Sequence, residues 1–213
     1  MTPEPIALQI ADELPKVYQS LASQSNDHLS QKAPQQPKST IVDLFAGVGG
    51  NVIGFACSGQ WSRIIAIEKD PDTLACAMHN ARIYGVYDQI TWVLGDCFDY
   101  LAAAKDGQPS SQELDEELRI DRATTTIFAS PPWGGVSYRD HQVFDLGLME
   151  PYNLEKLASA CRPWEYALFL PRTSDLRQLA GLAPKGKKVE VVQYCMEGAS
   201  KALVAYVPED SSM

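Results

Sequence analysis

A glycine-rich turn between Val42 and Asn51 joins a carboxylate to closely spaced glycines, an arrangement suited to binding a small charged molecule. The segment reads Val-Asp-Leu-Phe-Ala-Gly-Val-Gly-Gly-Asn, so a hydrophobic strand runs into the turn and a helix follows it. Glycine lets the backbone approach a ligand closely, and open α/β sheets bind ligands at the carboxyl ends of their strands. The spacing G-x-G-G differs from the G-x-G-x-x-G that seats a pyrophosphate, which Asp43 would also repel. Asp43 and Gly47 therefore favour a ligand with an ammonium and a sulfonium group; a glycine-rich connection without a ligand is the alternative.

Two further acidic residues stand at the ends of expected strands. Glu68 ends the second strand, where a carboxylate can accept hydrogen bonds from both hydroxyls of a ribose. Asp96 follows the third strand and could accept a hydrogen bond from an adenine amino group, with Phe98 offering an apolar face to the ring. A solvated carboxylate at Glu68 and an ordinary helix cap at Asp96 are the alternatives.

The most specific motif is Ser130–Gly135, which reads Ser-Pro-Pro-Trp-Gly-Gly at the end of the fourth expected strand. Because proline has a fixed φ and no N–H, two prolines in a row leave carbonyl oxygens outside regular secondary structure. An exocyclic amine of a nucleobase could donate to the Pro131 carbonyl and the Ser130 hydroxyl while Trp133 stacks on the base. Catalysis would then need mainly positioning, since a sulfonium methyl donor is already activated. The alternative is a purely structural turn.

The order of the expected elements indicates which fold positions these motifs. Seven segments have the composition of strands: Thr40–Phe45, Arg63–Glu68, Ile90–Leu94, Thr124–Ala129, Tyr166–Leu170, Lys188–Tyr194 and Ala202–Val207. Helical stretches lie between them: Asn51–Ser58, Pro71–Tyr84, Cys97–Ala104, Pro151–Cys161 and Ser174–Leu179. Each of the first five strands is separated from the next by such a stretch, which predicts a parallel sheet covered on both faces. The last two strands are joined by little more than Glu197–Ser200, which predicts an antiparallel hairpin. We therefore expect an α/β fold of the Rossmann-like methyltransferase type, with a mostly parallel seven-stranded sheet and a C-terminal antiparallel hairpin.

The rest of the chain divides around this core. Residues 1–39 are expected to form an N-terminal helix over Met1–Leu14 and a flexible linker, whose Ser20–Ser39 part is rich in Gln, Ser and Pro. Residues 40–208 form the predicted methyltransferase domain. A charged insertion, Lys105–Arg122, is expected to be a surface loop with a helical turn.

Charge and composition limit the classes of partner. The net charge of -9 argues against a broad grip on a phosphate backbone, but one nucleotide at a chain end needs only a pocket and one or two cations. No apolar run approaches the roughly 20 residues that span a bilayer, and no signal peptide opens the chain, so we expect a soluble, intracellular protein. The five cysteines are scattered and the three histidines do not cluster with them, which predicts reduced thiols and no metal or disulfide framework.

Taken together, the motifs resemble the catalytic domain of the trimethylguanosine synthase family, the RNA cap guanine-N2 methyltransferases. The resemblance covers nearly everything from Thr2 to Tyr206. Its discriminating piece is Ser130–Gly135, because related amino-methyltransferases usually carry Asn or Asp first and Tyr or Phe last. The other matching segments are Asp43–Asn51, Ile65–Pro71, Asn80, Tyr84-Gly85, Gly95-Asp96, Tyr138, Phe144-Asp145 and Leu170–Arg172.

The resemblance implies S-adenosylmethionine as the cofactor, bound by Asp43, Gly47, Glu68 and Asp96. The family usually carries a further helical segment before the position of Thr2, which helps to close the cofactor and cap pockets. This sequence starts at that position.

On the substrate side, the resemblance implies that Trp133 stacks on the 7-methylguanine of an RNA cap, with Ser130 beside the reacting amine. Asn80 and Arg172 would hold cap-side groups. Because N7-methylated guanine is cationic, stacking on indole would gain a cation–π contribution of roughly 0.5–2 kcal/mol. Base–aromatic stacking itself contributes about 1–3 kcal/mol.

The implied activity is methylation of N2 in the 7-methylguanosine caps of small nuclear and small nucleolar RNAs, by a monomer in the nucleus or nucleolus, without metal or membrane. Two other functions fit the same residues. One is a methyltransferase for another base amine in ribosomal RNA, transfer RNA or DNA, and the other is a cap-binding protein with impaired catalysis. A dinucleotide-dependent reductase is disfavoured by the glycine spacing.

Overall fold

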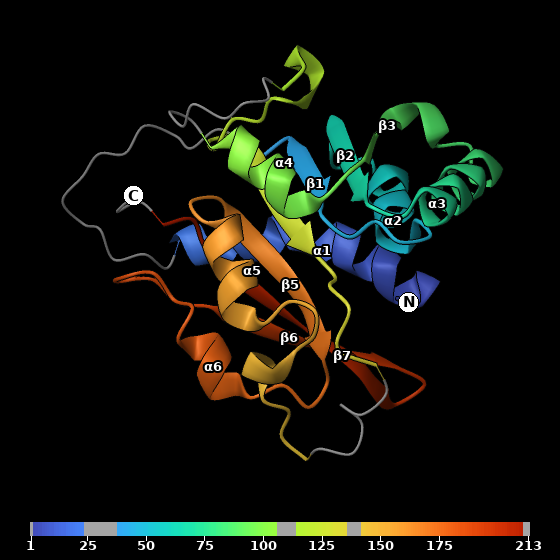
Figure 1. The fold of residues 1–213 in the computed structure, drawn as a ribbon. Coiled ribbons are helices and arrows are strands. Elements are labelled where there is room, and N and C mark those ends of the chain that lie inside the picture. The colour runs from blue at the N-terminus through green and yellow to red at the C-terminus, as the bar shows by residue number, and fades with distance from the viewer. Residues whose placement is uncertain (1, 24–37, 106–113, 136–141, 211–213) are drawn as a thin grey trace. The chain divides into compact units, whose positions relative to one another are not determined.

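The computed structural model describes residues 2–23, 38–105, 114–135 and 142–210 (Figure 1). Seven strands form one sheet in the order β3-β2-β1-β4-β5-β7-β6. The strands are β1 (Thr40–Asp43), β2 (Arg63–Glu68), β3 (Ile90–Leu94), β4 (Thr125–Ala129), β5 (Glu165–Pro171), β6 (Glu190–Met196) and β7 (Ala199–Val207). The α-helices are α1 (Glu4–Ser23), α2 (Gly50–Ser58), α3 (Pro71–Ile83), α4 (Cys97–Ala104), α5 (Leu154–Cys161) and α6 (Leu176–Ala180).

The predicted fold class is confirmed. Strand β1 pairs with β2, and β2 with β3, in parallel register. Strand β7 pairs antiparallel with both β5 and β6, so the chain ends in the expected hairpin. The turn of that hairpin has positive φ at Glu197 and Gly198, the backbone of a two-residue turn whose twist matches the flanking strands.

The chain forms two compact units. Unit 1 comprises Met1–Glu13 and Gln35–Ile127, and unit 2 comprises Leu14–Pro34 and Phe128–Met213. The unit boundary therefore falls inside α1 and inside β4. The predicted division at residues 39 and 40 stays a prediction, since residues 24–37 of the expected linker lie outside the described part of the chain.

Unit 1 holds the glycine-rich turn on a core of β-branched residues. All four residues of β1 are buried, as are the four central residues of β2. The helices α2 and α3 pack on these strands, α2 against β1 and β2 and α3 against β2 and β3 (Figure 1). Val52 and Phe55 of α2 are fully buried on this face. The strand ends are therefore fixed by packing, and the turns that follow them keep a defined position.

The first helix is longer than predicted. We expected it to end at Leu14, because Pro15 lacks an N–H and is disfavoured inside a helix. The structure continues the helix through Pro15 to Ser23. Leu14, Tyr18 and Leu21 are buried at helical spacing, so tertiary packing compensates for the missing hydrogen bond.

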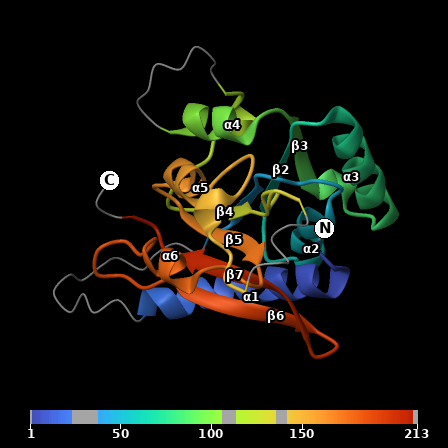
Figure 2. The ribbon, with the colours of Figure 1, turned by 60° about the horizontal axis from the view of Figure 1, so that its bottom comes forward.

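Unit 2 contains β5, β7 and β6, with β6 at the edge of the sheet (Figure 2). Five tyrosines are buried among its described residues, and the Tyr194 and Tyr206 hydroxyls share a hydrogen bond of 2.5 Å. Tyr18 of α1 meets the Tyr206 ring edge-on, at 5.8 Å between centroids. Among the described residues, no helix is both long and apolar enough to cross a membrane.

Candidate functional site

The glycine-rich turn is held from several sides by backbone hydrogen bonds in unit 1. The Ala46 N–H donates to the Ile67 carbonyl at 2.9 Å, and the Gly95 N–H donates to the Glu68 carbonyl at 3.0 Å. The turns that follow β1 and β3 are thus both joined to the end of β2. Gly47 and Gly49 have positive φ, at 54° and 94°, which explains why glycine is required there.

Asp43 ends β1 and is completely buried. Its Oδ1 accepts a hydrogen bond of 3.2 Å from the Phe45 N–H, whereas its Oδ2 has no partner among the described residues. Burial raises the pKa of this carboxyl to about 7, the nearby Glu68 carboxylate adds to the rise, and the Phe45 N–H opposes it. A buried acceptor without a partner is costly unless a ligand satisfies it. Asp43 therefore has the chemistry expected of a site for an ammonium group.

Glu68 has a structural task that the sequence did not indicate. Its Oε2 accepts the Gly47 N–H at 2.9 Å, and its Oε1 accepts the N–H groups of Lys69 and Asp70, each at 3.0 Å. A carboxylate has about four lone-pair sites, so the two oxygens keep capacity for a ligand hydroxyl. Glu68 thus orders the glycine-rich turn from the position predicted to bind a ribose.

Asp96 caps the helix α4, as the alternative interpretation had it, through a 2.7 Å hydrogen bond from the Phe98 N–H to its Oδ1. The cap uses one oxygen and leaves the other available, so it does not exclude a contact with adenine. Phe98 is half-buried beside it.

Asn80 lies on α3 in unit 1, and its side chain is turned to the glycine-rich turn. The Asn80 Nδ2 donates a 2.9 Å hydrogen bond to the Val48 carbonyl. The sequence had assigned this residue to the cap side. One amide N–H thus has a partner in the chain itself, and the second N–H and Oδ1 keep capacity for a ligand.

In unit 2, Trp133 follows the two prolines that come after β4. Its ring is half-buried and stacks with Phe169 of β5, at 5.7 Å between centroids and 22° between planes. The Trp133 Nε1–H also donates to the Phe169 carbonyl at 3.2 Å. Pro131 is buried and Ser130 half-buried at the same strand end. The indole is therefore oriented before any base stacks on it, and Phe169 is a supporting residue that sequence reasoning missed, although its place in a hydrophobic strand was predicted.

Arg172 is exposed in the turn after β5. The hydroxyl and N–H of Ser174 both donate to the Pro171 carbonyl, at 2.7 and 3.1 Å, and close this turn. Among the described residues, no ion pair involves Arg172. Its guanidinium is thus placed on a fixed turn and available to an anion.

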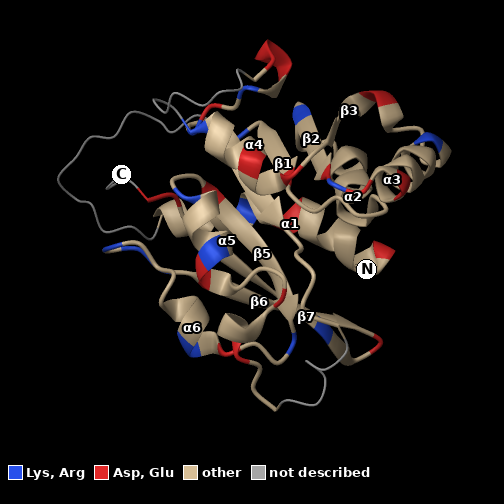
Figure 3. Ribbon diagram, in the orientation of Figure 1, with Lys and Arg blue, Asp and Glu red and all other residues tan. Residues whose placement is uncertain are grey.

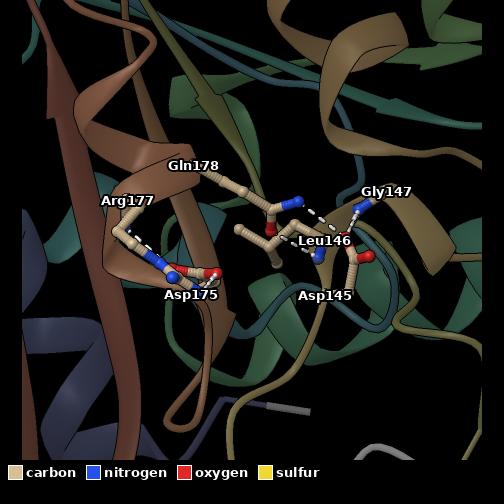
Figure 4. Close-up of polar contacts among 6 residues, drawn as sticks. All are labelled: Asp145, Leu146, Gly147, Asp175, Arg177 and Gln178. Atoms are coloured by element: carbon tan, nitrogen blue, oxygen red, sulfur yellow. Dashed lines mark hydrogen bonds and ion pairs between the residues drawn. The ribbon is translucent and has the colours of Figure 1, made fainter.

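Helix α6, which follows the turn after Arg172, is tied to residues 145–147 by a polar cluster (Figure 4). Gln178 accepts from the Leu146 N–H at 2.8 Å and donates to the Asp145 carboxylate at 2.6 Å. The same Asp145 oxygen accepts the Gly147 N–H at 2.8 Å. Tyr138, one of the residues that carry the family resemblance, lies outside the described residues. The polar cluster fixes residues 145–147, which come after it in the chain.

Charge is divided unequally between the units. The net charge of -9 belongs entirely to unit 1, whereas unit 2 has equal numbers of acidic and basic residues. Asp and Glu occur on α1, α3 and α4 of unit 1 (Figure 3). The acidic unit 1 suits a cationic ligand. The neutral unit 2 repels a phosphate chain less strongly than unit 1 does. No group of residues suited to holding a metal occurs in the described parts of the chain.

Comparison with solved structures defines the fold. An RNA methyltransferase from Salinibacter ruber, in complex with S-adenosyl-L-homocysteine, aligns over 100% of this chain and 95% of its own, with TM-score 0.50 and 18% identity. The N-terminal domain of human METTL16, also in complex with S-adenosyl-L-homocysteine, aligns over 99% of this chain and 73% of its own, with TM-score 0.56 and 13% identity. The fold is that of the class I Rossmann-like methyltransferases.

Sequence comparison then gives the family. The profile described as RNA cap guanine-N2 methyltransferase matches residues 38–210. The trimethylguanosine synthase of Schizosaccharomyces pombe is 34% identical over 170 residues, 78% of this chain and 64% of that protein. The Saccharomyces cerevisiae protein of the same name is 31% identical over 176 residues, 81% of this chain and 48% of that protein. The chain belongs to the RNA cap guanine-N2 methyltransferase family, which confirms the resemblance, and it spans less than two thirds of the length of these relatives.

Proposed function

We propose that this protein transfers a methyl group from S-adenosylmethionine to N2 of the 7-methylguanosine cap of RNA. The observation that carries the proposal is the Ser-Pro-Pro-Trp motif at the end of β4, within a chain that matches the cap guanine-N2 methyltransferase family over residues 38–210. Family membership supports the reaction class, and the oriented indole of Trp133 supports a base as the substrate.

In this proposal, unit 1 holds the cofactor, which supplies an activated methyl group. Asp43 Oδ2 accepts from the ammonium group, which fits a buried carboxylate oxygen that has no partner among the described residues. Glu68 accepts the ribose hydroxyls and Asp96 the adenine amino group, each with the lone pairs left by its backbone contacts. Gly47 gives the ligand close access to the backbone.

Unit 2 holds the cap. Trp133 stacks on 7-methylguanine, and its bond to Phe169 limits the rotamer entropy lost on binding. The Pro131 carbonyl and the Ser130 hydroxyl accept hydrogen bonds from the exocyclic amine. These bonds orient the nitrogen lone pair for attack on the methyl group of the cofactor. Arg172 pairs with a cap phosphate from its fixed turn. Asn80 keeps one N–H and its Oδ1 beside the hydrogen bond to Val48, and it would hold a cap-side group.

The cation on 7-methylguanine is the basis of selectivity. Stacking a cationic base on indole adds roughly 0.5–2 kcal/mol to ordinary stacking. The enzyme would thus act after N7 methylation and prefer that cap to an unmethylated one. The proposed substrates are the caps of small nuclear and small nucleolar RNAs, modified twice in the nucleus by a monomeric enzyme.

The decisive experiment is a methyl-transfer assay with labelled S-adenosylmethionine and two short RNAs that differ only in the N7 methyl of the cap. We expect label on the 7-methylguanosine-capped RNA, recovered after nuclease digestion as N2-methylated nucleosides. Label on an internal base, or equal transfer to the unmethylated cap, would instead support a methyltransferase for another base amine. Binding of 7-methylguanosine triphosphate without transfer would identify a cap-binding protein with impaired catalysis.

A further inference from the structure

The large apolar side chains that are exposed in unit 2 occur on two neighbouring segments of the chain. Among the described residues of this unit they are Val143, Leu148 and Leu176, with exposed fractions of 59%, 67% and 56%. Single exposed apolar residues are ordinary on a protein surface, whereas their concentration in one region indicates a binding surface. These three residues are called the apolar patch below.

Hydrogen bonds join the two segments that carry the patch. The Phe144 N–H donates to the Thr173 carbonyl at 2.7 Å, and the Asp175 N–H donates to the Phe144 carbonyl at 3.0 Å. Gln178 of α6 adds a side-chain bond of 2.6 Å to the Asp145 carboxylate (Figure 4). The apolar side chains are therefore carried on a fixed backbone, which lowers the entropy lost when a ligand binds.

Arg172 lies between the proposed base site and the patch along the chain. Trp133 stacks on Phe169 of β5, and Arg172 follows Phe169 by three residues, a span of about 10 Å in an extended strand. The next residue, Thr173, accepts the hydrogen bond from the residue that follows Val143. A cap with its base on Trp133 and its phosphates at Arg172 would therefore direct the nucleotides that follow toward the patch.

Charge favours RNA as the occupant of the patch. The exposed guanidinium of Arg172 suits a phosphate, and unit 2 has equal numbers of acidic and basic residues, so it does not repel a phosphate chain. Bases of single-stranded RNA are unstacked and can place their apolar faces on side chains. Apolar side chains beside a phosphate-binding cation thus fit a nucleotide chain better than a strongly charged ligand.

We propose that the apolar patch binds the bases of the first nucleotides that follow the cap in single-stranded RNA. This inference rests on the proposed function and deepens it, because it adds a second region of the same substrate to the cap. Capped oligonucleotides should therefore bind more tightly than the isolated cap, and the difference should depend on the patch.

The test compares 7-methylguanosine triphosphate with a 7-methylguanosine-capped tetranucleotide in fluorescence titrations. We expect wild-type protein to bind the tetranucleotide about tenfold more tightly. Val143→Ala, Leu148→Ala and Leu176→Ala should each weaken tetranucleotide binding about two- to threefold, and the triple variant about tenfold, because each removes apolar surface that a base covers. Affinity for 7-methylguanosine triphosphate should stay within about twofold. Leu8→Ala, at an exposed leucine of α1 in unit 1, is the matched control and should change neither affinity.

Three results would overturn the inference. One is a wild-type protein that binds the tetranucleotide no more tightly than 7-methylguanosine triphosphate. Another is a triple variant with full affinity for the tetranucleotide, the result expected if the patch serves a protein partner. The third is an equal loss for both ligands, which would make the patch part of the cap pocket.

An uncapped tetranucleotide with a 5′-triphosphate separates this inference from the proposed function. If wild-type protein binds it as tightly as the capped form, and the triple variant loses affinity for both, the patch binds RNA and cap recognition is refuted. In wild-type protein with ¹³C-labelled methyl groups, the signals of the patch should shift with the capped tetranucleotide and stay in place with 7-methylguanosine triphosphate. Patch signals that ignore the tetranucleotide would contradict the inference without any variant.

Discussion

Asp43 makes cofactor binding dependent on pH in the neutral range. Its carboxyl is buried, and its pKa is raised to about 7 by burial and by the Glu68 carboxylate. An ammonium group at Oδ2 favours the ionised carboxyl, so the pKa must fall when the ligand binds. Binding therefore expels a proton whenever Asp43 is protonated in the free protein. Affinity should rise with pH and level off above pH 7.

The size of the effect follows from the ionised fraction. With a pKa of about 7, about half of the free protein is ionised at pH 7 and roughly 3% at pH 5.5. If only the ionised form binds, the dissociation constant increases about fifteenfold between these two pH values. At pH 6, where about nine tenths of the carboxyl is protonated, each binding event should release close to one proton.

The assay is calorimetric titration with S-adenosylhomocysteine, which keeps the ammonium group and lacks the sulfonium. Titrations at pH 6 in buffers of different ionisation enthalpy count the protons released. The control is Asp43→Asn, in which affinity should be low and nearly constant from pH 5.5 to 7. A wild-type affinity that does not change over this range, with no proton released, would refute the assignment of Asp43 to the ammonium group. The same pH dependence in Asp43→Asn would trace the titration to another residue.

Three substitutions test the remaining contacts. Trp133→Ala should weaken binding of 7-methylguanosine triphosphate by about 2–4 kcal/mol, with a smaller loss for Trp133→Phe; unchanged affinity in fluorescence titrations would exclude base stacking at this residue. Glu68→Ala should lower affinity for S-adenosylhomocysteine about tenfold or more, because it removes both a ribose acceptor and the support of the turn; equal calorimetric affinity would contradict this. Gly49→Ala should destabilise the fold by about 1–3 kcal/mol in urea titrations, more than Gly59→Ala, which also has positive φ but leads into open space. Equal losses for the two glycine variants would show that contact with α3 is unimportant.

Much of the fold could be predicted because the signals are local. The strand Arg63–Glu68 and the helix Cys97–Ala104 were predicted to the residue, since hydrophobic runs and caps mark their ends. The end of α1 was missed because it depends on non-local packing. Nothing in the sequence around Pro15 shows that Leu14, Tyr18 and Leu21 have buried surface to pack on.

In the candidate site, too, local sequence signals predict some features, whereas others depend on contacts between distant parts of the chain. The positions of Asp43 and Glu68 follow from the strands that they end, and that of Trp133 from the strand that precedes its motif, so the sequence indicates them. Contacts with residues far away along the chain do not follow from such local signals. The contact of Glu68 with Gly47 spans 21 residues, that of Asn80 with Val48 spans 32, and that of Trp133 with Phe169 spans 36. Pairing an aromatic residue with a particular position of β5 requires the strand register, which hydrophobic patterning alone leaves open.

The buried carboxyl of Asp43 links ligand binding to stability. A pKa raised from 3.8 to about 7 means that the folded protein holds a proton which the unfolded chain releases. The associated stability is fully present below pH 4 and is lost as pH rises through 7, on the order of 4 kcal/mol. At neutral pH the free protein therefore carries an unfavourable buried charge, and a cationic ligand relieves it. A chain selected for stability alone would have no reason to keep an acid at the end of a buried strand. Because a buried carboxylate is unfavourable without a cationic partner, Asp43 indicates a ligand that carries an ammonium group. The sequence suggested the same role for this residue from its position before the glycine-rich turn.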